Sequence, residues 1–503
     1  MKKNNVRRAG ILMPVSSLPS TCGIGTLGAG AYAFVDWLQS AGMQVWQVLP
    51  LLPTGYGDSP YQSCASNALN YYFIDFPLLE KEGLLSREDY AGIVWGDDER
   101  RVDYGKLFEY KVQVLEKAFS RFDRQSASWQ AFLEKAEYLD FATFMTLKRK
   151  FHYAPWTEWV EPYKSCEGNL PQEFYQEYEE ELLFWQFTQY IFRNQWNSLR
   201  QYANAKGISI MGDMPIYLAE DSVETWKYRR KLFLLDEQGN LALRAGVPPD
   251  AFSEDGQLWG NPVYDWEKLK KDNYAWWKQR IRYAFDTQFD IIRIDHFRAF
   301  DRFFAIPNGA ETAKEGEWMD GPKAALFKGF EDAEIIAEDL GIIDDGVRTL
   351  LRETGYPGMK VFEFAFDGNP ENEYLPSNVQ TENCVAYTGT HDNDTLRSFL
   401  ENMDESTRKD FENVLEDECL KADVPYITET VEAECRSIIE LLFSCKANTV
   451  IIPMHDVLCF GAEARLNAPS TVSSQNWTFR FTLQDFGRRK AAWLKELTDV
   501  YKR

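Results

Sequence analysis

Helix-like amphipathic stretches and short buried runs alternate along the chain. Apolar residues recur at helical spacing over 31–41, Gly42 ends this stretch, and an apolar run follows at 45–49. The same order returns before Gly207 and residues 208–211. The eight runs predicted to be buried strands are 10–15, 45–49, 208–211, 289–294, 335–337, 359–364, 384–387 and 449–452. Alternating helices and buried strands predict an α/β fold with a parallel sheet, and eight such units predict a closed (β/α)8 TIM barrel.

Two segments do not fit a simple crossover between strands. Roughly 140 residues separate the second and third predicted strands, far more than one crossover needs, so residues 58–200 are predicted to be a mainly helical insertion. Residues 217–266 are punctuated by glycine and proline, which predicts an ordered, loop-rich insertion. We therefore predict a single barrel domain over 1–503, with large insertions at the carboxyl ends of strands 2 and 3. Both would stand over the barrel mouth, and 217–266 would cover a site there.

Charged residues crowd the end of the predicted strand at 289–294. Arg293, Asp295 and His296 end or follow its apolar run, and ligands bind at the carboxyl ends of barrel strands. On this stretch alone, a structural ion pair explains the charges as well as a functional site does.

Acidic residues also follow two other predicted strands. Glu338 and Asp339 come after the fifth strand, and His391 and Asp392 come after the seventh. Taken alone, the acids at 338–339 would suit a solvated pair that opens the next helix. Acids from three strands, however, converge on one mouth. Such carboxylates suit cleavage of an acetal without a metal: one attacks the anomeric carbon, one protonates the leaving oxygen, and one supports the oxocarbenium-like transition state.

Composition and charge exclude several other classes of protein. The 503 residues carry a formal charge of −23 without a basic cluster, so nucleic acid and acidic membranes are poor partners. No run approaches the ~20 apolar residues of a membrane span. Pro14 interrupts the apolar start too early for a signal peptide, which predicts a cytoplasmic protein. Eight cysteines without C-x-x-C spacing indicate neither a zinc site nor a disulfide framework. Gly23, Gly25 and Gly28 fit a dinucleotide fingerprint but lack its strand-turn-helix context, which favours a flexible loop.

Several longer motifs occur in one fixed order along the chain. They are 59–63 (SPYQS), 212–217 (GDMPIY), 247–253 (VPPDAFS), 256–262 (GQLWGNP), 293–298 (RIDHFR), 336–341 (IAEDLG) and 389–395 (GTHDNDT). With these motifs the chain resembles the 4-α-glucanotransferases, also called amylomaltases or disproportionating enzymes, of the α-amylase-like superfamily. Some positions depart from the family pattern, namely Ala251, Ala299, His455 and Ser470. None of these is one of the three carboxylates.

The resemblance implies a retaining transglycosylase that needs no cofactor and no metal. It would move α-1,4-glucan segments from a maltooligosaccharide, starch or glycogen chain to the 4-hydroxyl of another glucan or of glucose. By the same resemblance, Asp295 is the nucleophile that forms a covalent glucosyl intermediate, Glu338 is the general acid and base, and Asp392 stabilises the transition state. Residues implied in substrate binding are Ser59, Tyr61, Tyr104, Asp213, Asp250, Gln257, Trp259, Arg293, His296, Asp339, Asp367, His391 and Asn467.

Two alternatives to a transglycosylase remain at this point. An α-glucan hydrolase of the α-amylase type would use the same scaffold and the same carboxylates. A non-catalytic glucan-binding protein is disfavoured because all three carboxylates are present.

Overall fold

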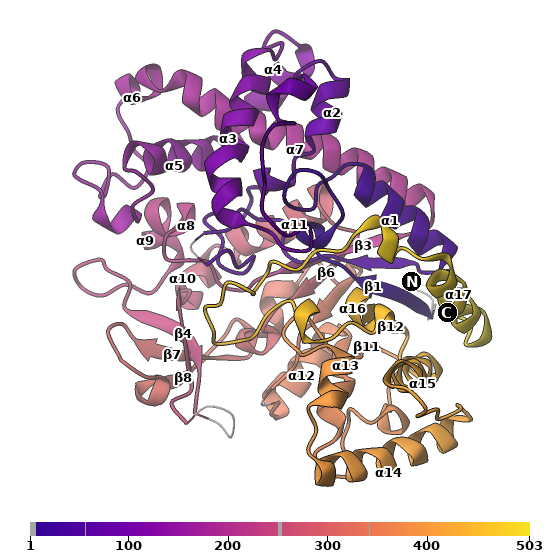
Figure 1. The fold of residues 1–503 in the computed structure, drawn as a ribbon. Helices are drawn as coiled ribbons and strands as arrows, with labels where there is room; N and C mark the ends of the chain where they lie inside the picture. Colours follow the sequence, from indigo (N-terminus) through magenta and orange to yellow (C-terminus); the bar gives the residue numbers. More distant parts are fainter. Residues whose placement is uncertain (1–6, 56, 250–253, 342) are drawn as a thin grey trace.

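A computed structural model describes residues 7–55, 57–249, 254–341 and 343–503 (Figure 1). Eight parallel strands form its central sheet, in the order β10-β11-β12-β1-β2-β3-β6-β9. The sheet closes between its two outer strands, because the Ala337 amide donates to the Pro357 carbonyl at 2.9 Å. The predicted (β/α)8 barrel is therefore confirmed. The barrel strands are β1 (Arg8–Leu12), β2 (Val45–Gln47), β3 (Ser209–Met214), β6 (Ile291–Ile294), β9 (Ile335–Ala337), β10 (Gly358–Val361), β11 (Cys384–Tyr387) and β12 (Thr449–Pro453).

The barrel strands are short and almost wholly buried, as expected for a parallel sheet covered on both faces. Every residue of β2, β6, β9, β11 and β12 is buried. Gly10 is required in β1, because an added Cβ would lie 2.4 Å from the Val45 carbonyl oxygen of β2. Continuous apolar runs of this kind explain why the sequence pattern located these strands.

Helices surround the barrel and also form the segment between β2 and β3. There α2 to α6 and the start of the long α7 stand over one side of the barrel, around buried aromatic rings such as Trp129 and Trp185 (Figure 1). The helices are α1 (Ala29–Ser40), α2 (Phe76–Lys81), α3 (Tyr104–Ser120), α4 (Ala127–Glu134), α5 (Leu139–Lys150), α6 (Gln172–Glu177), α7 (Glu179–Ala205), α8 (Val223–Lys227), α9 (Arg229–Leu232), α10 (Trp266–Lys271), α11 (Ala275–Thr287), α12 (Asp345–Thr354), α13 (Leu396–Glu401), α14 (Glu405–Ala422), α15 (Val431–Ser444), α16 (Met454–Leu458) and α17 (Arg488–Val500).

A small antiparallel sheet lies beside the barrel in the order β5-β4-β7-β8. Its strands are β4 (Leu243–Val247), β5 (Gln257–Pro262), β7 (Arg302–Pro307) and β8 (Glu317–Asp320). The first two belong to the segment predicted to be loop-rich, whereas β7 and β8 follow the fourth barrel strand, where no insertion was predicted. The pairing of β4 with β7 joins residues about 60 positions apart in sequence, as in Ala245 with Ala305. No local pattern indicates such a partner.

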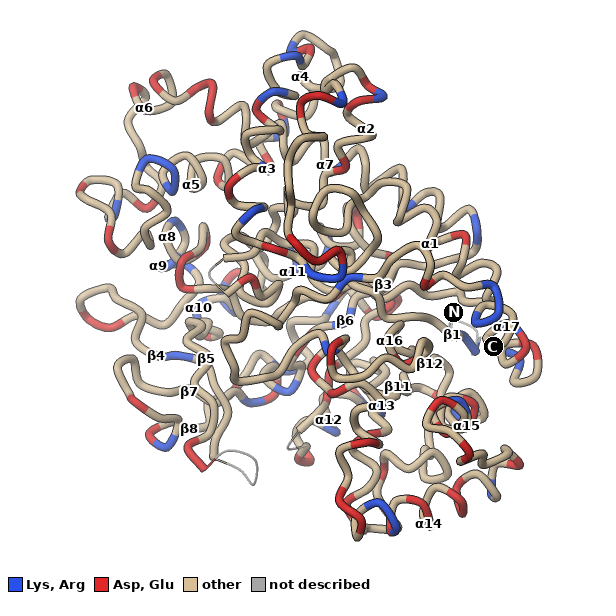
Figure 2. Tube along the Cα trace, viewed as in Figure 1, with Lys and Arg blue, Asp and Glu red and all other residues tan. Residues whose placement is uncertain are grey.

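Acidic and basic residues are interspersed over the molecule. Figure 2 shows Asp and Glu along the helical insertion and α14, with Lys and Arg among them. The formal charge of −23 is thus spread over the molecule. Within the described ranges, no helix is both long enough and apolar enough to span a bilayer.

Candidate active site

The predicted acids follow three different barrel strands. Asp295 comes directly after β6, Glu338 comes directly after β9, and Asp392 lies in the loop between β11 and α13. Parallel strands bring these three positions to the same end of the barrel.

A cavity of about 690 Å³ lies at this end. Its walls come from the loops after β2, β3, β6 and β11, from β5, and from the C-terminal segment 467–477. The predicted site residues that line it are Ser59, Tyr61, Gln257, Trp259, Asp295, His296, His391, Asp392 and Asn467.

Arg293 forms an ion pair with the carboxylate of Asp295. One guanidinium nitrogen of Arg293 lies 3.0 Å from Asp295 Oδ1 and 2.6 Å from Asp213 Oδ2. Burial would lower the pKa of Arg293, but the two aspartates outweigh it and raise that pKa well above its usual value. The strand then ends sharply, since His296 has a left-handed backbone (φ 49°). Asp295 is therefore held beside a permanent cation.

Glu338 is buried and bonded to two backbone amides. Its Oε2 accepts from the His296 amide at 2.6 Å, and its Oε1 accepts from the Leu340 amide at 2.8 Å. Burial, with the charge of Asp295 as a second cause, raises the pKa of Glu338 to about 7. A carboxyl group in this state exchanges protons near neutral pH, as a general acid and base must.

The environment of Asp392 favours its ionised form, in contrast to that of Glu338. Asn467 Nδ2 donates to its Oδ1 at 2.7 Å, and His391 Nε2 lies 3.4 Å from its Oδ2. Burial opposes ionisation, but His391 and Asn467 outweigh it and lower the pKa of Asp392 to about 2. The same contact raises the pKa of His391, even though burial acts against it. Asp392 is consequently ionised whenever Glu338 titrates.

Tyr61 contacts both Asp213, the partner of Arg293, and His391, the partner of Asp392. Its hydroxyl donates to Asp213 Oδ2 at 3.0 Å and lies 3.3 Å from His391 Nδ1. Its ring stacks on His391, with centroids 4.8 Å apart and planes 17° from parallel. Trp259, which also lines the cavity, packs edge-on against His296 with centroids 4.8 Å apart. Flat apolar faces beside carboxylates suit a sugar, whose C–H faces stack on rings while its hydroxyls bond to acids.

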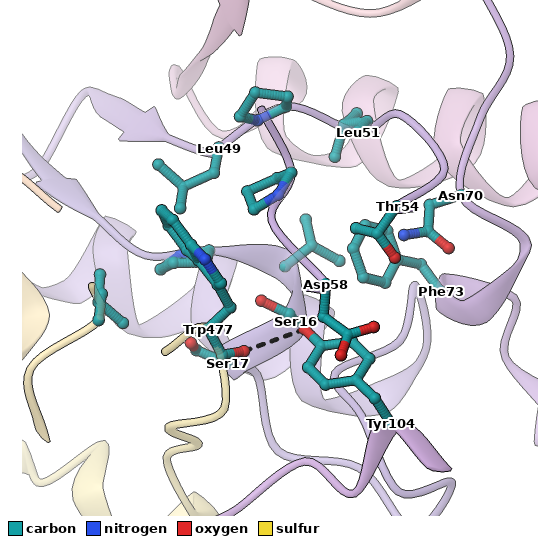
Figure 3. Close-up of a pocket in the computed structure, with 15 residues that line it drawn as sticks. Ser16, Ser17, Leu49, Leu51, Thr54, Asp58, Asn70, Phe73, Tyr104 and Trp477 are labelled. Atoms are coloured by element: carbon teal, nitrogen blue, oxygen red, sulfur yellow. Dashed lines mark hydrogen bonds between the residues drawn. The ribbon is translucent and has the colours of Figure 1, made fainter. Parts of the chain in front are cut away.

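Several predicted residues lie elsewhere. Asp339 points to the barrel wall, where its Oδ1 accepts from the Met359 amide at 2.6 Å. Asp367 is exposed and accepts from the Asn369 amide. Tyr104 lines a separate, smaller cavity (Figure 3). The remaining prediction, Asp250, lies outside the described residues.

Sequence reasoning missed other residues of the cavity wall. Gln62 and Asn261 exchange two amide hydrogen bonds, of 3.1 and 3.2 Å, that join the two insertions. Both belong to motifs that marked the family, so their positions were available as a signal. Trp477 marks the end of the stretch over which the family resemblance extends, but no motif assigns a role to its side chain. Further wall residues are Tyr217, Leu258, Pro469, Ser470, Thr471, Val472, Ser473 and Asn476.

Among the residues that the structure describes, no group of three or more His, Cys, Asp or Glu side chains is placed to hold a metal ion. The described site combines carboxyl groups and one guanidinium with aromatic rings, imidazoles and side-chain amides. On a (β/α)8 barrel, with one carboxyl group near neutrality and another held ionised, these define an enzyme that acts on glycosidic bonds.

Comparison with known proteins gives the family. The model of a family described as 4-alpha-glucanotransferase matches residues 13–484. A 4-alpha-glucanotransferase of Clostridium butyricum is 42% identical over 500 residues, which cover 98% of this chain and 100% of the relative. A chloroplastic or amyloplastic 4-alpha-glucanotransferase of Arabidopsis thaliana is 38% identical and covers 99% of this chain and 86% of its own. The amylomaltase of Streptococcus agalactiae, solved in complex with acarbose, superposes with a TM-score of 0.91 at 39% identity, over 99% of both chains.

The chain belongs to the 4-alpha-glucanotransferase family. The family assignment made from the motifs is confirmed.

Proposed function

We propose that the protein transfers α-1,4-glucan segments between maltooligosaccharides by a retaining double displacement. Transfer of glucan segments is the activity for which the family is named. The observation that carries the mechanism is the contrast between the three carboxyl groups, of which Asp295 is paired with Arg293, Glu338 has a pKa of about 7, and Asp392 has a pKa of about 2.

In the first half of the reaction, Asp295 attacks the anomeric carbon of the donor, and Glu338 gives its proton to the leaving glycosidic oxygen. The bond to the leaving glucan breaks as the bond to Asp295 forms. Asp392 is ionised and half-exposed to the cavity, so it can stabilise the positive charge that develops on the sugar ring. His296 and His391 line the same space and are proposed to bond to sugar hydroxyls.

In the second half, the 4-hydroxyl of an acceptor glucan replaces the leaving group. Glu338, now ionised, takes the proton of that hydroxyl as its oxygen attacks the anomeric carbon and displaces Asp295. Transfer requires that a sugar reach the intermediate before water does. Trp259, on β5, and the C-terminal segment 467–477 both line the cavity, and they are proposed to hold the acceptor and limit water.

Maltotriose distinguishes transfer from hydrolysis. The purified protein is expected to convert maltotriose into glucose and a ladder of longer maltooligosaccharides, because each transfer shortens one chain and lengthens another. The total number of reducing ends should stay constant, which a reducing-sugar assay measures beside chromatography. A steady rise in reducing ends with only shorter products would show an α-glucan hydrolase instead.

Asn467 offers a test of the role of Asp392. Asn467→Ala removes the hydrogen bond to Oδ1, and loss of a bond to a charged group of this kind is expected to lower kcat by about 10- to 100-fold. Steady-state kinetics with maltotriose measures the effect. Asn402→Ala, an exposed change at the C-terminal end of α13 that removes a hydrogen bond to Ser398, is the matched control. Equal losses in both variants would contradict a specific link between Asn467 and Asp392.

We also propose the cytoplasm as the compartment, with glucans and glucose as the only partners that the reaction needs. The scattered cysteines support a reducing compartment, and the acidic charge of the chain disfavours nucleic acid and acidic membranes as partners.

A further inference from the structure

Trp477 has a backbone conformation that a tryptophan rarely adopts. Its φ is +65°, in the left-handed region, where a bulky residue is strained and glycine is not. The surrounding chain holds this conformation from both sides. The Trp477 amide donates to the Leu466 carbonyl at 2.7 Å, and its own carbonyl accepts from the Tyr104 hydroxyl at 3.0 Å (Figure 3). Strain held in this way at a cavity wall points to a function for the side chain that the strain positions.

The ring of Trp477 packs against two residues of the proposed sugar site. Its centroid lies 5.8 Å from that of Tyr61 and 5.9 Å from that of His391, at tilted angles of 44° and 38°. These two rings in turn stack on each other. The three rings form one aromatic cluster, and ring pairs at such distances stabilise each other beyond simple burial.

Trp477 also separates two spaces. It lines the catalytic cavity and, with Leu49, Asp58 and Tyr104, the smaller cavity that Figure 3 shows. Only 8% of Trp477 is exposed. The ring of Trp477 is therefore a wall against which Tyr61 and His391 rest, and Leu49, Phe73 and Tyr104 are among the residues that line the smaller cavity with it.

We propose that Trp477 is a positioning residue for glucan transfer. Its ring holds Tyr61 and His391 at the angle from which Tyr61 bonds to Asp213 and His391 lies against Asp392. The hydrogen bond from Tyr104, at the start of α3, makes the helical insertion part of this support. The inference rests on the proposed roles of the three carboxylates. Misplacement of positioned groups by about 1 Å can cost about 10²-fold in rate.

Two substitutions of Trp477 distinguish the effect of a flat ring from the effect of apolar volume alone. Trp477→Phe keeps a ring at this position, whereas Trp477→Leu keeps an apolar side chain without one. We expect the phenylalanine variant to retain kcat for maltotriose within about 3-fold, and the leucine variant to lose about 10-fold or more. KM should change by less than about 3-fold in both, because the effect is on alignment rather than on binding.

A buried tryptophan far from the cavity is the matched control. Trp129 in α4 is 1% exposed and packs among Phe122, Phe132 and Tyr190 at the far end of the helical insertion. Trp129→Leu should lower the melting temperature through lost packing and leave kcat unchanged when assayed well below that temperature.

A second readout follows the contact of His391 with Asp392. The chain has 4 histidines, so the Cε1 signals of labelled histidine can be assigned by single substitution and followed as a function of pH. Because the contact with Asp392 raises the pKa of His391, Trp477→Leu is expected to lower the titration midpoint of the His391 signal, while Trp477→Phe and Trp129→Leu leave that midpoint unchanged.

Three outcomes would overturn the inference. They are equal kcat in the two Trp477 variants, a rise in KM at unchanged kcat, which would make the ring a simple sugar contact, and an unchanged titration midpoint of His391 in Trp477→Leu. A different experiment tests the proposed mechanism itself, because full transfer activity in Asp295→Asn would contradict that mechanism. The kcat values of the two Trp477 variants could still be compared in that case.

Discussion

Replacing Asp295 with asparagine is expected to reduce glucan transfer by about 10⁴-fold or more, the scale on which enzymes lose activity when their nucleophile is removed. The asparagine amide has the same shape but cannot attack the anomeric carbon as a carboxylate does. Arg293 retains its 2.6 Å contact with Asp213, so the local structure has a partner for the guanidinium. Product formation from maltotriose, followed by chromatography, measures the loss.

Binding of the glucan should survive this substitution. The rings and amides that line the cavity are unchanged, so a maltooligosaccharide titration by calorimetry is expected to give a Kd within about 10-fold of the wild type. Asp286→Asn, an exposed change in the helix before the same strand, is the matched control and should have wild-type kinetics. Wild-type turnover by Asp295→Asn would remove Asp295 from the mechanism.

Glu338→Ala is expected to lose about 10²- to 10⁴-fold in transfer from natural glucans, the range that general acid catalysis contributes. A maltooligosaccharyl fluoride of α configuration needs no proton on its leaving group, so its glycosylation rate should fall far less. Stopped-flow release of fluoride measures that step. A loss of the same size with both donors would contradict the role of Glu338 as a proton donor.

The pH dependence of transfer tests the role of Glu338 as the general acid independently. Because the pKa of Glu338 is raised to about 7, the acid form is present below this pH and is lost above it. Wild-type kcat/KM for maltotriose should therefore decline as pH rises through about 7. In Glu338→Ala with the fluoride donor, this decline should be absent.

Added azide should replace the acceptor and give a product of α configuration, since it attacks the same covalent intermediate.

The barrel and the positions of its acids could be predicted because both depend on local sequence. A strand buried on both faces is a continuous apolar run, and a charged residue that ends such a run must lie at the strand end. Asp295 after β6 and Glu338 after β9 are cases of this rule. The rule does not say which way a side chain at the strand end turns. Asp339 follows Glu338 directly, but it bonds to the Met359 amide, whereas Glu338 bonds to the His296 amide.

Other features depend on contacts between distant parts of the chain. The small sheet pairs β4 with β7, which lie on either side of β6 in the sequence, and no local pattern in either strand indicates that partner. The contact of Tyr61 with His391 joins residues 330 positions apart. The backbone conformation of Trp477 could not be predicted from adjacent residues either, because hydrogen bonds to Leu466 and Tyr104 hold it.

The amide pair of Gln62 and Asn261 bears on how the pH profile is interpreted. At the cavity wall, the segment between β2 and β3 contacts the segment between β3 and β6 through neutral groups. These groups neither titrate between pH 4 and 10 nor lose strength through screening by salt, as an exposed ion pair does. The spacing between the insertions at this point should thus stay constant while Glu338 changes its protonation state. The pH dependence of transfer would then report the proton on a carboxyl group, and ionic strength would have little effect on it.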